Sequence, residues 1–102
     1  MSIILKLELI NTSRSPPEVI DNFGFIIVRN TSKEELTELL YEIGFDYERE
    51  TDTFELELTG DDFIKVYTEE VEDEKIKDVD NISDLQDLIT KIISIAKNEV
   101  EE

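Results

Sequence analysis

The chain has 102 residues, with 27 acidic and 10 basic side chains, a formal net charge of −17, and neither Cys nor His. This length predicts a single domain over residues 1–102. The missing Cys excludes disulfides and thiolate zinc sites, and the missing His removes the commonest general base and transition-metal ligand. We therefore expect neither an enzyme nor a bound cofactor or metal.

The first ten residues alternate between apolar and polar side chains, with Lys6 and Glu8 interrupting the apolar run. No small-residue cleavage site follows, so residues 2–10 predict a first strand rather than a signal peptide. No stretch approaches the roughly 20 apolar residues that span a bilayer. We expect a cytoplasmic protein that makes no membrane contact.

The next segments predict a loop, a helical turn and a second strand. Residues 11–17 are rich in turn-forming residues, and a short helical turn is expected at 19–23. Residues 23–30 are apolar on both faces between Phe25 and Val28. Such a pattern is typical of a central strand that is covered on both sides.

The best-marked element is a helix between Ser32 and Gly44. Ser32 is a favourable N-cap, Glu35 stands at the capping-box position, and an apolar stripe at helical spacing follows. Gly44 supplies the C-terminal stop.

Alternating strands are then expected at 45–48, 54–58 and 63–71, with a weak sixth strand at 75–79. The last helix runs from an N-cap at Ser83 to the C-terminal end. The order β-β-α-β-β-β(-β)-α predicts an α+β domain: a mostly antiparallel sheet of 4–6 strands with two helices packed on one face.

The net charge lies entirely in the middle of the chain. Between Glu34 and Asp87 there are 21 acidic residues against four basic ones, whereas the two flanks together hold six of each. A general need for solubility would spread the charge over the whole surface. Its concentration in one block favours a basic partner.

Within this block the acidic residues fall into regular arrays. On the first helix, Glu34, Glu38 and Glu42 form an i, i+4, i+8 line of like charge, which costs a few tenths of a kcal/mol per pair. The last helix instead makes the favourable i, i+4 pair Asp87–Lys91. The first helix thus places like charges at i, i+4, whereas the last helix places opposite charges there. An unfavourable arrangement with no visible gain in stability suggests a functional surface.

The strands continue this array with carboxylates about 6.7 Å apart along a strand and about 4.8 Å apart between strands. A basic groove that accepts closely spaced phosphates could accept such a surface. The predicted partner-binding residues are Glu34, Glu38, Glu42, Asp46, Glu48, Glu55, Glu57, Glu69 and Glu70.

Other motifs give weaker indications of function. Residues 78–84 have the spacing of an acidic metal loop, but Ile82 stands where an oxygen ligand is needed and Ile89 where the bidentate Glu belongs. A helix-cap loop accounts for that segment, and a turn accounts for Asp61-Asp62. The negative charge disfavours direct nucleic-acid binding.

In size, charge and composition the chain resembles the small acidic DNA-mimic proteins with which phages and archaeal viruses block restriction or CRISPR nucleases. That resemblance implies a stoichiometric inhibitor of a basic nucleic-acid-binding protein. Two alternatives stay open: an immunity protein or antitoxin against a basic toxin nuclease, and an assembly subunit that docks through the last helix. A homodimer is compatible with each.

Overall fold

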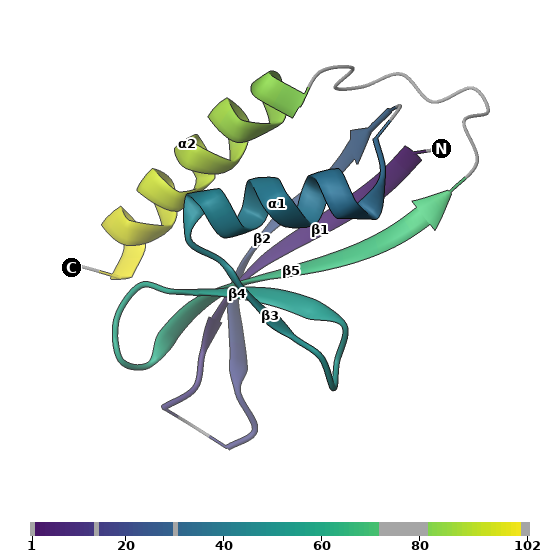
Figure 1. Cartoon of the computed structure of the whole chain (residues 1–102). Helices are drawn as coiled ribbons and strands as arrows, with labels where there is room; N and C mark the ends of the chain where they lie inside the picture. Colours follow the sequence, from purple (N-terminus) through teal and green to yellow (C-terminus); the bar gives the residue numbers. More distant parts are fainter. Residues whose placement is uncertain (1, 14, 30, 72–81, 101–102) are drawn as a thin grey trace.

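The structure is a computed structural model that describes residues 2–13, 15–29, 31–71 and 82–100. Five strands form one antiparallel sheet in the order β2-β1-β5-β4-β3. Both helices lie on the same face of this sheet (Figure 1). The predicted α+β fold is therefore confirmed. In chain order the elements are β1 (Ser2–Asn11), β2 (Glu18–Val28), α1 (Lys33–Ile43), β3 (Asp46–Glu48), β4 (Thr53–Glu57), β5 (Asp62–Val71) and α2 (Ile82–Val100).

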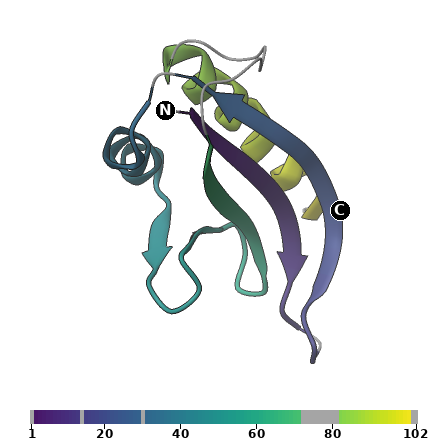
Figure 2. The same cartoon turned by 90° about the vertical axis from the view of Figure 1, so that its right-hand side faces the viewer.

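The core lies between the sheet and the two helices. Alternation along β1 turns one set of side chains toward the helices, and all four of these are fully buried. The members of this set are Ile3, Leu5, Leu7 and Leu9. Each such side chain contributes about 1.5–3 kcal/mol through burial. In Figure 2, α2 lies behind β1 and β2, and α1 lies toward the side of β3.

The predicted caps of the first helix are present. The backbone N–H of Glu35 donates to Ser32 Oγ at 3.1 Å, and the backbone N–H of Gly44 donates to the Leu40 carbonyl at 3.1 Å. Gly44 has a φ of 124°, which favours a residue without a Cβ. The last helix begins at Ile82, so the predicted N-cap Ser83 lies within its first turn.

The second strand differs from the prediction in two ways. Residues 19–23 are part of β2 rather than a helical turn, because they pair with β1 as far as Glu18. Two irregularities in this pairing, around Gly24 and Ile20, each insert one extra residue into β2. Gly24 has a φ of 85°, as expected where a strand bulges.

β2 is also an edge strand, so the expectation of a central strand covered on both sides is wrong. The pattern from Phe25 to Val28 does produce burial on the helix side, where Ile26 and Val28 lie in the core. Neither α1 nor α2 covers the other side of the sheet, and 69% of Phe25 is exposed there. A local pattern reports how apolar a segment is, but not where the strand stands in the sheet. The predicted sixth strand at 75–79 lies outside the described residues, as does most of the 78–84 loop.

Candidate functional site

The sheet face that points away from the helices holds the acidic residues of β3 and β4. Asp46 pairs with Glu55 and Glu48 pairs with Thr53 in the antiparallel register, so their side chains share this face with Glu57. We call Asp46, Glu48, Glu55 and Glu57 the acidic hairpin face. The predicted crowding of these four carboxylates on one face is present in the structure.

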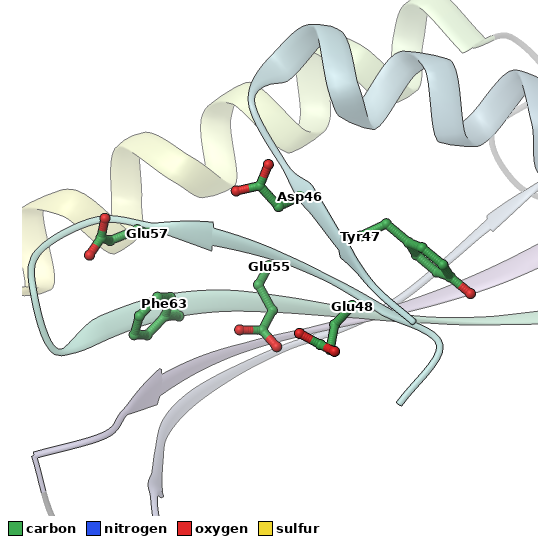
Figure 3. Close-up of a pocket in the computed structure, with 6 residues that line it drawn as sticks. All are labelled: Asp46, Tyr47, Glu48, Glu55, Glu57 and Phe63. Carbon is green, nitrogen blue, oxygen red and sulfur yellow. The ribbon is translucent and has the colours of Figure 1, made fainter. Parts of the chain in front are cut away.

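The acidic hairpin face surrounds a shallow concavity of about 280 Å³. Figure 3 shows Glu48 and Glu55 extending to the same side of the strands, whereas the Tyr47 ring extends away from them. Phe63 from β5 also lines the concavity, in register with Glu57. The sequence prediction missed Phe63. The signal was available, because period-two alternation places Phe63 on the same face as Lys65.

Lysines on the uncovered face are engaged by neighbouring carboxylates. Lys6 Nζ lies 3.3 Å from Glu8, and Lys65 Nζ lies 4.0 Å from Glu55. Both ammonium groups also lie over the Tyr67 ring, at 5.6 and 5.7 Å from its centroid. Glu8 is only 8% exposed, which is uncommon for a carboxylate and requires such partners.

Tyr67 completes this polar cluster. Burial raises the pKa of its hydroxyl, and a hydrogen bond to Glu8 raises it further. The cluster lies between the acidic hairpin face and the apolar end of the sheet, because Lys6 and Glu8 belong to β1 and Lys65 and Tyr67 to β5. The positive charge of the uncovered face is therefore held in its middle.

The predicted line on α1 lies on a different surface. Glu34, Glu38 and Glu42 are exposed on the side opposite the buried Leu36 and Leu40. Two of the three, Glu38 and Glu42, line a second shallow concavity of about 200 Å³. Because α1 covers the helix side of the sheet, this line and the acidic hairpin face do not form one continuous plane.

A polar tie connects α1 to the β3–β4 turn. Lys33 Nζ lies 2.9 Å from Asp52 Oδ1, and the Tyr47 hydroxyl donates to the same oxygen at 2.6 Å. These contacts lower the pKa of Asp52, mainly through the Tyr47 hydrogen bond and then through Lys33. The same hydrogen bond is the main cause that raises the pKa of Tyr47. The tie fixes the turn next to the start of α1.

The last two predicted residues, Glu69 and Glu70, lie on β5, away from the acidic hairpin face. Glu69 is in register with Ile4 on the uncovered face and lines a concavity of about 170 Å³ with Phe25 and Tyr67. Glu70 is in register with the core residue Ile3, so its side chain starts toward the helix side. The nine predicted residues thus occupy several surfaces, of which the acidic hairpin face is the most concentrated.

The acidic pair Asp61-Asp62 belongs to a turn, as predicted. Asp62 accepts hydrogen bonds from Asn11 Nδ2 and Thr59 Oγ1, both at 2.7 Å, and these close the turn before β5. Within the described ranges, no group of three or more acidic side chains is arranged to hold a metal ion. Neither helix, over the residues described, is long and apolar enough to cross a membrane.

Comparisons of the whole chain were made with protein-family models, with curated proteins and with solved structures. None of the three finds a match.

Proposed function

We propose that this protein is a small stoichiometric inhibitor that mimics the charge of a nucleic acid and occupies the nucleic-acid-binding surface of a basic protein. The single observation that carries this proposal is the acidic hairpin face. Four carboxylates lie together on the sheet face opposite α1 and α2, and neither β3 nor β4 contains a Lys or Arg. Like charges placed opposite one another weaken a sheet, so their retention favours a role in binding.

The spacing of these carboxylates suits a groove that binds phosphates. Residues two apart on a strand are about 6.7 Å apart, and neighbouring strands are about 4.8 Å apart. Duplex DNA carries one charge per about 1.7 Å of its axis, and proteins meet it with several closely spaced Lys and Arg. The same cations would find closely spaced partners on the acidic hairpin face.

The concavity adds a specific contact to this general attraction. Phe63 lines the concavity together with the four carboxylates, so a partner would meet an aromatic side chain beside negative charge. Charge complementarity accelerates association, while aromatic contacts at the centre of an interface supply much of the affinity. The α1 line, near the same end of the sheet, would extend the negative field.

This role is non-enzymatic and needs no cofactor, and we place it in the cytoplasm, that of the host cell if the source is viral. The partner we propose is a nuclease or another subunit of a nucleic-acid-targeting defence complex of the anti-restriction or anti-CRISPR kind. An immunity protein against a toxin nuclease would use the same surface. The assembly alternative rested on the apolar face of α2. That face packs against the sheet through Leu85, Ile89 and Ile92, leaving Ile95 exposed.

The test is mutual exclusion with nucleic acid. The purified chain is used to capture proteins from a nuclease-treated lysate, and each captured protein is purified and loaded with labelled duplex DNA or RNA. We expect this protein to displace the label at a one-to-one ratio, followed by fluorescence anisotropy. A captured protein that holds nucleic acid and this chain at the same time would overturn the proposal.

A further inference from the structure

Exposed apolar side chains concentrate on β2. Six large apolar residues are exposed in the part of the chain that the structure describes, and three of them belong to this strand: Val19, Ile20 and Phe25. Phe25 is the most exposed of the six, at 69%. It lines the concavity that also contains Ile4 and Tyr67. Three such residues on one edge strand mark a surface suited to association.

The segment Phe25–Val28 combines these side chains with a regular backbone. Its register with β1 runs without interruption from Lys6 to Ile3, and the two irregularities of β2 lie outside it. The segment is uncharged and consists of residues that favour strands. Natural edge strands are commonly protected by charge, proline or bulges, and Phe25–Val28 has none of these. Among the described residues, no strand pairs with its outer side.

The sequence pattern and the fold of a single copy therefore disagree about this segment. The pattern is that of a central strand covered on both faces, whereas one copy places the segment at an edge with one face uncovered. Another strand at this edge would give the segment the central position that its pattern predicts. If that strand belongs to a second copy, the two copies carry the same net negative charge, so the pairing surface must itself have little charge.

Charge identifies the second copy as a suitable occupant. Residues 2–29, which contain β1 and β2, have three acidic and three basic side chains, so this end of the sheet is neutral. The acidic hairpin face lies on the two strands at the opposite edge, three to four strand spacings or about 14–19 Å away. That separation exceeds the screening length of about 8 Å at physiological salt. A basic partner is attracted to the other edge, while two copies meet here without strong repulsion.

We propose that two copies of this chain pair antiparallel through Phe25–Val28 and form one sheet that continues through both. A two-fold axis would make the contact self-complementary, as in most homodimers. β2 then becomes a central strand, the Phe25 side chain packs beside the β2 side chains of the second copy, and the acidic hairpin faces lie at the two outer ends. The dimer does not depend on the proposed inhibitor function, since it uses the opposite edge.

The first test is sedimentation equilibrium of the full chain from about 1 µM to 1 mM protein. We expect a concentration-dependent dimer that added salt preserves or strengthens, because screening reduces repulsion between the acidic ends. Phe25→Lys should raise the dimer dissociation constant at least tenfold. Tyr41→Lys is the matched control, since Tyr41 is another exposed aromatic residue, 52% exposed on α1. It should leave the dimer intact.

The second test needs no variant. Amide hydrogen exchange of the wild-type chain should show that Phe25–Val28 loses protection on dilution to monomer, whereas β4 keeps its protection. A chain that stays monomeric at every concentration would overturn the proposal. A dimer that survives Phe25→Lys, is lost equally with Tyr41→Lys, or leaves the exchange of Phe25–Val28 unchanged would also overturn it.

Discussion

The sheet ends in β3 on one side and in β2 on the other, and the two edge strands have opposite chemistry. β3 is three residues long and presents Asp46 and Glu48 to the uncovered face. β2 is eleven residues long and presents Val19 and Phe25 to the same face. A short charged edge resists pairing with another strand, whereas a long edge that contains the uncharged and regular segment Phe25–Val28 favours it.

This difference separates two kinds of contact within one small sheet. Charge on β3 and β4 attracts a basic surface over a distance, and apolar side chains on β2 act only on contact. The polar cluster around Glu8 lies between them, and its Lys65 pairs with Glu55 at the border of the acidic hairpin face. One uncovered face thus holds a site that attracts a partner through its charge and a site that acts only through direct apolar contact.

Neutralising the acidic hairpin face should have the largest effect on partner binding. The variant Asp46→Asn/Glu48→Gln/Glu55→Gln/Glu57→Gln should weaken binding to the captured basic partner by about 100-fold, mainly through slower association. Dimer formation should be unchanged. Surface plasmon resonance measures the first effect and sedimentation the second.

The matched control for that variant is Glu34→Gln/Glu38→Gln/Glu42→Gln, which neutralises the line on α1 instead. We expect a clearly smaller loss, because this line lies on the other side of the sheet from the concavity. A larger loss of affinity from the α1 variant would show that the partner binds at that helix instead.

The polar cluster between the two ends should contribute to stability. Glu8→Gln replaces a buried carboxylate that is paired with Lys6 and hydrogen-bonded to Tyr67. The free energy of unfolding should fall by about 1–3 kcal/mol, measured by urea denaturation. Glu69→Gln, an exposed change on the same face, should stay within about 0.5 kcal/mol. Equal effects of the two substitutions would mean that the cluster does not stabilise the sheet.

Binding of the basic partner and dimer formation should depend differently on salt concentration in the wild-type chain. Raising ionic strength from about 0.05 to 0.2 M should slow association with a basic partner by about tenfold, because surface charges are screened. The dimer should not weaken. Loss of both contacts at the same salt concentration would show that the β2 contact is electrostatic as well.

The smallest expected effect concerns the tie at Asp52. Its side chain is 55% exposed, so Asp52→Asn should cost only about 0.5 kcal/mol at neutral pH. Asn tolerates the φ of 53° at this position, so the change isolates the charge.

The pH dependence of this tie follows from the direction of the shift. The pKa of Asp52 is lowered in the folded state. Its contribution is therefore complete above the unfolded value near 3.8 and is lost as pH falls through the lower folded value. The difference between Asp52→Asn and wild type in thermal denaturation should shrink at acid pH.

Much of the fold followed from local rules. The alternation of β1 and β4, the caps at Ser32 and Gly44 and the helical stripes all depend on residues near one another in sequence. The face shared by Asp46, Glu48 and Glu55 was predictable for the same reason, because a short hairpin fixes its own register.

The rest depended on long-range pairing. Strand order decides that β2 is an edge, that Phe63 lies beside Glu57, and that Glu8 is enclosed between Lys6 and Tyr67. It also separates the α1 line from the acidic hairpin face. The edge position of β2 and the contact between Glu8 and Tyr67 depend on segments far apart in the chain, which local periodicity does not report.

By itself the sequence determined that the chain forms an α+β domain and that its negative charge lies in the middle segment, because composition and periodicity are local properties. Only the tertiary structure decided that four of these carboxylates gather on one sheet face near β3 and that the strand containing the uncharged segment Phe25–Val28 forms the other edge. The physical reason is that hydrogen bonding between strands assigns each segment its neighbours. Neighbours determine which side chains are buried, paired or exposed.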